Sequence, residues 1–250
     1  MNAPPQHRVS EDVLTAFFES GDAMRSRSVS NVLISGTIDI PEPPTRLRAD
    51  WQREIASRMV LEVGDVEAMP LARARARWPD YQRCVQAVSD WACAQGLPAT
   101  LLAPSDVALM ACRGARYHHD GAQYSHVAFC NLFLSDDLGL DLHFPSIGHR
   151  LPLTRGTVVI FDTGQPHGVI RRGSGGFNAT DFTRDQDWIQ TFLTWELAIE
   201  EPLLSRALKI AFDVAPALAS RAESNSDAEQ ICLNGEPAVV CPDSGRWCPS

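Results

Sequence analysis

The stretch RGTVVIFDTGQPHGVIRR, residues 155–172, says most about the fold of this chain. It predicts a turn at Gly156, a buried strand that runs to Phe161, a tight DTGQP turn and a second strand that begins at His167. Two short apolar runs joined by turn residues are typical of neighbouring antiparallel strands. The stretch therefore predicts a reversal of the chain, with an imidazole at the start of the second strand.

Short apolar segments of the same kind occupy the chain on both sides of this stretch. They lie between residue 98 and about residue 200 and include SDVALMACRGARYH, SHVAFCNLFLSD, LGLDLHF and WIQTFLTWEL. Turn residues separate these segments. The spacing predicts an antiparallel barrel or sandwich rather than strands that alternate with helices.

The segments outside this core have mostly helical patterns. Helices are predicted at residues 10–20, 49–63 and 78–96, a strand at 30–40, and a closing helix that is interrupted or ends near Pro216. We therefore expect an α+β chain with a mainly β core, arranged as a single domain over residues 1–220. Its expected parts are helical support (1–97), a β-barrel core (98–200), a closing helix (201–220) and, beyond the domain, an irregular tail (221–250).

Composition limits the class of partner. The formal net charge is −9 and the pI is near 5.2, which argues against nucleic acid because phosphate binding needs a basic surface. No stretch approaches the ~18 apolar residues of a membrane span, and the first residues show no apolar signal core. We expect a cytoplasmic protein that binds a small molecule and no membrane. Its seven cysteines are expected to be thiols, or in the tail a disulfide, rather than zinc ligands; its oligomeric state stays open.

The stretch RYHHDG, residues 116–121, holds the candidate metal ligands. Side chains two apart on a strand share a face, so His118 and Asp120 can point inward together while His119 points away. With His167 they would make a two-histidine, one-carboxylate site, which suits iron(II) and leaves coordination positions open. Two alternatives remain: a hydrogen-bonded polar turn, or an all-histidine site in which His119 or His126 joins His118.

The combination of His-x-Asp, G-x-x-x-x-F-D and PHGV resembles the 2-oxoglutarate/Fe(II)-dependent dioxygenases of the double-stranded β-helix fold, over roughly residues 100–200. The resemblance implies a jelly-roll or cupin-like barrel with flanking N-terminal helices and a C-terminal helix. It also implies that His118, Asp120 and His167 bind Fe(II), that 2-oxoglutarate chelates the metal and that O2 takes the last position. The implied activity is hydroxylation of a small polar molecule, such as an amino acid derivative or a secondary metabolite.

The sequence departs from the family pattern at the position of the cosubstrate arginine. In the family a basic residue about ten positions beyond the distal histidine pairs with the far carboxylate, and GGFN stands there instead. The candidates are Arg171, Arg172 and Arg184, and Arg171 shares the face of His167 if HGVIRR is a strand.

Further pocket residues are expected around the metal. Asn131 and Tyr117 are candidate cosubstrate contacts, and Tyr124 and His143 are candidate substrate contacts. The alternative function is a cupin-like protein that binds a small molecule or a metal without redox chemistry.

Overall fold

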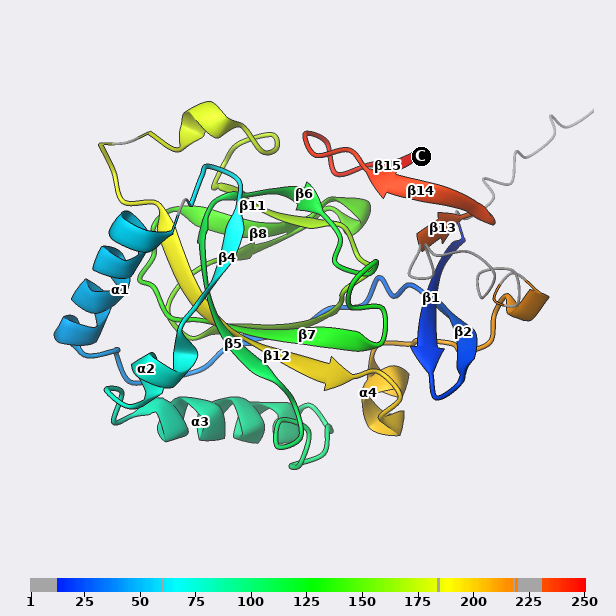
Figure 1. Cartoon of the computed structure of the whole chain (residues 1–250), viewed down its shortest axis with the longest axis horizontal. Helices are drawn as coiled ribbons and strands as arrows, with labels where there is room; N and C mark the ends of the chain where they lie inside the picture. The colour runs from blue at the N-terminus through cyan, green and yellow to red at the C-terminus, as the bar shows by residue number, and fades with distance from the viewer. Residues whose placement is uncertain (1–12, 60, 184, 218, 220–230) are drawn as a thin grey trace, which may run out of the picture.

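Two antiparallel sheets form the centre of the computed structural model, which describes residues 13–59, 61–183, 185–217, 219 and 231–250 (Figure 1). The larger sheet has the order β3-β10-β7-β12-β5-β4 and the smaller sheet the order β6-β11-β8-β9. The strands of the larger sheet are β3 (Ile34–Thr37), β10 (Thr157–Asp162), β7 (Val127–Phe133), β12 (Ile189–Ala198), β5 (Val107–Arg113) and β4 (Val66–Met69). Those of the smaller sheet are β6 (Ala115–His118), β11 (His167–Arg171), β8 (Leu140–Phe144) and β9 (His149–Pro152).

The path of the chain from β5 to β12 identifies the architecture. The chain crosses between the two sheets as it goes from β5 to β6, β7 and β8, and again from β9 to β10, β11 and β12. The result is a double-stranded β-helix, in which β10-β7-β12-β5 face β6-β11-β8-β9. The expected fold class, a mainly β core of this type, is confirmed.

The central strands β7 and β10 of the larger sheet are buried on both faces. Along β10, Val158 and Ile160 pack in the cluster beneath the helices, whereas Val159 and Phe161 pack in the cluster between the sheets. Successive side chains of a strand point to opposite faces, and both faces are covered here. This explains why TVVIF is a continuous apolar run in the sequence.

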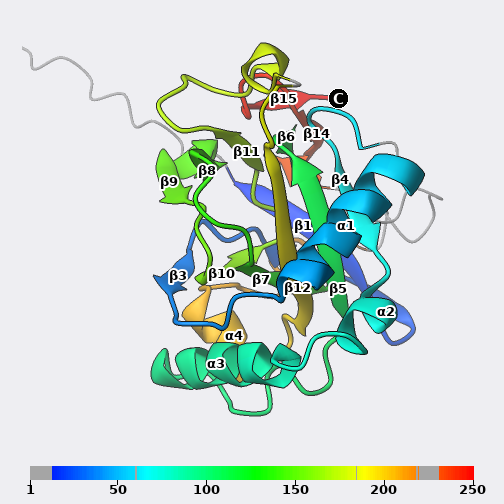
Figure 2. The same ribbon diagram turned by 90° about the vertical axis from the view of Figure 1, so that its left-hand side faces the viewer.

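Helices cover the outer face of the larger sheet (Figures 1 and 2). Trp51 and Ile55 of α1 and Val88 of α3 share a core cluster with Leu109 and Leu193 of the sheet. The helices are α1 (Thr45–Arg58), α2 (Leu71–Arg75), α3 (Tyr81–Ala94) and α4 (Pro202–Ala207), with short 3-10 turns at Pro145–Ile147 and Ala179–Asp181. None of the helices in the described ranges is long and apolar enough to cross a membrane.

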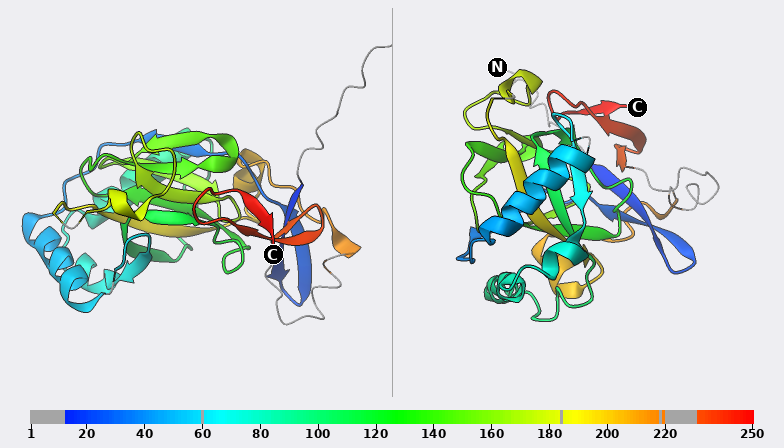
Figure 3. Two further views of the ribbon diagram at one scale, coloured as in Figure 1. Left: turned by 90° about the horizontal axis from the view of Figure 1, so that it is seen from above. Right: turned by 60° about the vertical axis from the view of Figure 1, so that its left-hand side comes forward.

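A third sheet joins the two ends of the described chain (Figure 3). Its order is β15-β14-β13-β1-β2, formed by β1 (Leu14–Ser20), β2 (Ala23–Ser28), β13 (Ile231–Leu233), β14 (Glu236–Val240) and β15 (Trp247–Pro249). Figure 3 shows the C-terminal strands beside the N-terminal hairpin, at one end of the molecule.

This sheet corrects two predictions. The segment 10–20, predicted to be a helix, is a strand from Leu14, and residues 10–12 lie outside the described part. The strand is favoured because β2 and β13 pair with its two edges. Its apolar residues also pack in two different clusters, one on each face. The tail predicted to be irregular forms three strands over residues 231–249, while 221–230 lie outside the described part. The closing helix is also shorter than expected: α4 ends at Ala207, and Lys209 has a left-handed φ of 56°.

Candidate metal centre

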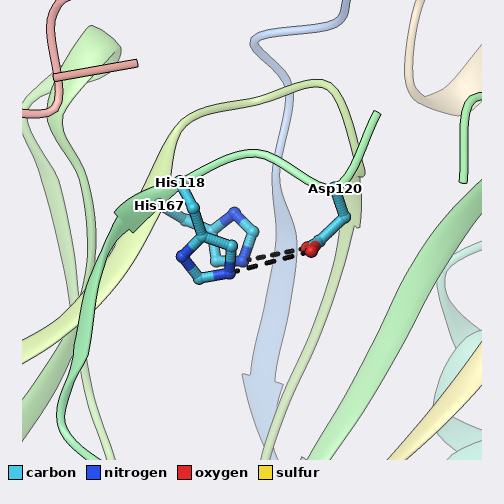
Figure 4. Close-up of side chains that lie close together, drawn as sticks. All are labelled: His118, Asp120 and His167. Carbon is cyan, nitrogen blue, oxygen red and sulfur yellow. Dashed lines mark ion pairs between the residues drawn. The ribbon is translucent and has the colours of Figure 1, made fainter. Parts of the chain in front are cut away.

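Three side chains with metal-binding atoms converge where β6 ends and β11 begins (Figure 4). His118 is the last residue of β6, His167 the first of β11, and the two are direct partners in the ladder, so their rings lie 4.4 Å apart between centroids. Asp120 follows two residues after His118. Its carboxylate oxygens are 3.8 Å from His118 Nε2 and 3.4 Å from His167 Nε2, and one ligand atom from each residue lies within 4.8 Å of the others. One ion can be reached by all three.

Backbone carbonyls orient both imidazoles. His118 Nδ1 is 2.7 Å from the carbonyl oxygen of Arg116, and His167 Nδ1 is 3.0 Å from that of Gln165. In each case the Nδ1–H donates to the carbonyl, which leaves the Nε2 lone pair free on the side of Asp120. Metal-bound histidines are commonly fixed in this way.

The two loops that carry the ligands are tied to each other. The Asp120 amide donates to the carbonyl oxygen of Thr163 at 2.8 Å, and the Thr163 hydroxyl donates to the Tyr124 carbonyl oxygen at 2.7 Å. A Cβ added at Gly121 would lie 2.9 Å from the Cα of Gly164, so this contact requires glycine. The loop glycines thus let Asp120 approach His167.

Burial sets the protonation of the group. Desolvation, aided by the neighbouring His118, lowers the pKa of His167 well below its usual value, so this imidazole is neutral and its Nε2 can bind a metal. Burial raises the pKa of Asp120, and His118 opposes that shift. A partly buried carboxylate beside the neutral imidazole of His167 is an arrangement that a cation stabilises.

The other two candidate histidine ligands lie away from this cluster. His119 points to the opposite side, where its ring is 5.0 Å from that of Trp247, and burial lowers its pKa. His126 is exposed. Among the described residues, the geometry therefore brings Asp120, and neither of these histidines, together with His118 and His167.

A cavity of about 250 Å³ opens beside the three ligands, between the two sheets. Tyr124 and Asn131, both expected near the site, line it. Thr194 and Glu196 of β12 also line it and were missed by the sequence analysis, although polar residues two apart on an otherwise apolar strand are a usable signal. The other lining residues are mainly apolar, among them Val66, Met110, Phe129, Val169 and Phe192.

Tyr117 and His143 do not line this cavity. They lie on the outer face of the smaller sheet, where the Tyr117 hydroxyl is 2.6 Å from His143 Nδ1. The alternation of side chains along β6 explains this, since Tyr117 must face away from His118. The expectation that both residues contact the ligand in the metal pocket is corrected accordingly.

The candidate arginines are placed differently from one another. Arg171 is exposed and its guanidinium carbon lies 5.5 Å above the Trp188 ring. Arg172 points away from the cavity and binds Asp137 and Asp141, each at 2.9 Å, which corrects its assignment as a cosubstrate contact. Arg184 lies outside the described residues. Within the described ranges, no lysine or arginine lines the cavity.

Strand order and ligand geometry together define a double-stranded β-helix protein with a candidate two-histidine, one-carboxylate centre. No protein-family model matches the chain, and no curated protein sequence matches it. Some solved structures are similar, all at low identity. The chain is 11% identical to the viral collagen prolyl hydroxylase from Paramecium Bursaria Chlorella virus-1, with 72% of this chain and 97% of that chain covered and a TM-score of 0.39.

Two further structures show the same level of similarity. EvdO2 from Micromonospora carbonacea var. aurantiaca, complexed with 2-oxoglutarate, is 13% identical over 67% of this chain and 94% of its own, with a TM-score of 0.37. The non-heme alpha-ketoglutarate-dependent epimerase SnoN from nogalamycin biosynthesis is 12% identical over 66% and 76%, with a TM-score of 0.39. Similarity this distant carries no argument for this chain, whose fold rests on its own strand order.

Proposed function

We propose that this protein is a non-haem iron(II)- and 2-oxoglutarate-dependent oxygenase that oxidises a small molecule. The observation that carries the proposal is the convergence of His118, Asp120 and His167 at one side of a cavity inside a double-stranded β-helix. Two imidazoles and one carboxylate suit iron(II) and leave room on the metal for further ligands. Bound there with 2-oxoglutarate and O2, iron(II) supplies the oxidising power that the side chains themselves lack.

The role of the protein is to hold the ligands and to keep water away. The carbonyl oxygens of Arg116 and Gln165 fix the two imidazoles. The ring of Phe161 packs edge-on to that of His167, at 4.8 Å between centroids, and closes this side of the site to solvent.

The far carboxylate of 2-oxoglutarate needs hydrogen-bond donors. Within the cavity, the hydroxyl groups of Tyr124 and Thr194 and the amide of Asn131 offer neutral donors. Arg171, which follows Val169 on the cavity-facing side of β11, and Arg184 remain the proposed cationic partners. We further propose hydroxylation of a small polar molecule, such as an amino acid derivative or a secondary metabolite, as the reaction.

One observation favours a second candidate function. Because no lysine or arginine among the described residues lines the cavity, a cupin-like protein that binds a metal or small molecule without redox chemistry also fits. The two functions differ in one property, the chelation of 2-oxoglutarate by the bound metal.

That difference decides the experiment. Fe(II) and then 2-oxoglutarate are added to metal-free protein without oxygen, and the visible metal-to-ligand charge-transfer band is recorded. The band should form in the wild type and in His119→Ala, the matched control, because His119 faces away from the site. It should be lost in His118→Ala and His167→Ala. Stoichiometric iron without the band would favour the second candidate, and unchanged iron binding in Asp120→Ala would refute the proposed ligand set.

A further inference from the structure

The cavity wall formed by β7 and β12 carries polar groups with unused acceptor atoms. Thr194 pairs with Asn131 across the two strands, and Glu196 pairs with Phe129. Because the two pairs are two residues apart along each strand, all four side chains lie on the face that lines the cavity. Asn131 is only 7% exposed, and its Oδ1 accepts no hydrogen bond. A buried polar atom without a partner is costly, which indicates that a ligand group fills this need.

Glu196 is the second polar group of this wall. It lines the cavity, and in the described part of the chain its carboxylate makes no hydrogen bond or ion pair. Burial and the nearby Asp106 raise its pKa, and His126 opposes that shift. Asp141 and Asp162, which are buried, each pair with an arginine instead. Glu196 thus differs from them in facing open space that a ligand can enter.

Aromatic rings stand next to this carboxylate. Phe129 is opposite Glu196 in the ladder, and the Tyr124 ring packs edge-on to Phe129 with 5.1 Å between centroids. Ring faces beside a carboxylate attract alkylammonium groups, because the ring quadrupole and the charge act in the same direction.

The charge balance of the cavity points the same way. Asp120 and Glu196 both line it, and the described lining residues include no lysine or arginine to offset them. An iron(II) ion would balance Asp120 and one carboxylate of 2-oxoglutarate, and the proposed arginine partner would balance the other, so that Glu196 is left without a lysine or arginine partner. A second anion would be repelled here, whereas a cation would complete the site.

We propose that the cavity binds an alkylammonium substrate, with the ammonium group held by Glu196 and Asn131 Oδ1 and the alkyl part against apolar side chains such as Val66, Met110 and Phe192. The proposal rests on the proposed function, since it names the substrate class of the same site. It assigns Glu196 the role of a specificity-determining residue that contacts the substrate.

The test uses three probes of equal length and different charge: n-pentylamine, pentan-1-ol and pentanoate. Mn(II) takes the place of Fe(II), and the broadening of the probe's methylene proton signals reports binding close to the metal, with 2-oxoglutarate present. The variant is Glu196→Gln. The matched control is Glu67→Gln, which removes the same charge from β4 of the same sheet, next to Val66 and on the face away from the cavity.

Pentylamine should be broadened most, and Glu196→Gln should weaken its binding by roughly tenfold or more, the usual effect of losing a charge-assisted hydrogen bond. Glu67→Gln should bind it like the wild type, and Mn(II) affinity should be equal in all three proteins. Equal broadening by amine and alcohol, preference for pentanoate, or unchanged amine binding in Glu196→Gln would overturn the inference.

Failure of the proposed function gives a different result. If wild-type protein binds no Mn(II), the proposed metal site is refuted. Calorimetric titration of metal-free protein with pentylamine then tests amine binding by the cavity independently of the metal. Heat of binding in the wild type that is lost in Glu196→Gln would support an amine-binding cavity, and no heat in the wild type would overturn it.

Discussion

Replacing Arg27 with methionine should lower the free energy of unfolding by about 3–5 kcal/mol, the usual cost of removing one partner from a buried ion pair. Arg27 and Asp162 are both fully buried, and the two guanidinium nitrogens lie 2.7 and 2.9 Å from the two carboxylate oxygens. Asp162 also accepts hydrogen bonds from the backbone amides of Ser30, at 2.7 Å, and Gly164, at 2.8 Å. In the variant its charge would stay buried without a cation.

This ion pair also supports both loops of the candidate metal centre. Arg27 Nε donates to the carbonyl oxygen of Ser125 at 2.7 Å, in the loop that follows Asp120. Asp162 ends β10 and holds Gly164 in the loop that leads to His167. We therefore expect Arg27→Met to weaken metal binding as well as the fold.

Urea unfolding followed by tryptophan fluorescence measures the loss, provided that the m-value is unchanged between variants. Arg25→Met is the matched control, on the same strand two residues away. Arg25 pairs with Glu200 and Asp213 at the surface, so its replacement should cost about 1 kcal/mol or less. If Arg27→Met is no more destabilising than Arg25→Met, the buried pair does not hold the hairpin to the barrel, and the reasoning fails.

Three further predictions follow from packing. Gly121→Ala should destabilise the protein by about 1–3 kcal/mol in thermal unfolding, because the added Cβ would lie 2.9 Å from the Gly164 Cα; an unchanged midpoint would contradict this contact. Ile231→Ala should cost about 2–5 kcal/mol in urea unfolding, since this residue is 1% exposed; a cost below 1 kcal/mol would mean that the C-terminal strands are not docked. Burial raises the pKa of the Cys112 thiol to about 12, so it should resist a thiol reagent at pH 8 while exposed Cys93 reacts; equal rates in mass spectrometry would refute this.

The barrel was predictable from sequence because its signals are local. Each strand there is a short apolar run between turn residues, and β7 and β10 of the larger sheet are buried on both faces. The turn near residue 164 was predicted, but it leads from β10 in one sheet to β11 in the other, and β11 pairs with β6 instead of β10. The pairing of His118 with His167 is therefore a long-range contact that the turn alone does not predict. Alternation along β6 separates Tyr117 from His118, so the position of Tyr117 outside the pocket was also predictable.

The third sheet, formed by β15-β14-β13-β1-β2, was not predicted from the sequence, for a different reason. Residues 10–20 have a serine, early acids and apolar spacing that suit a helix, yet Gly21 and Asp22 form a two-residue turn between β1 and β2. In the tail, Asn234 and Gly235 join β13 to β14, and both have positive φ. An Asn-Gly pair between two strands is the strongest short-range hairpin signal in a sequence. No local signal, however, predicts that β13 pairs with β1, because that partner lies at the other end of the chain.

The pairing of β1 with β13 has a consequence for the order of folding. Synthesis releases the N-terminal hairpin long before residues 231–233 exist, so β1 keeps an open edge while the barrel is being made. Ile231 then packs on Gly121 and Gly164, the glycines of the two ligand loops. The loops therefore reach their final packing only when this late strand arrives, and a chain that ends before it should form the barrel and still bind metal poorly.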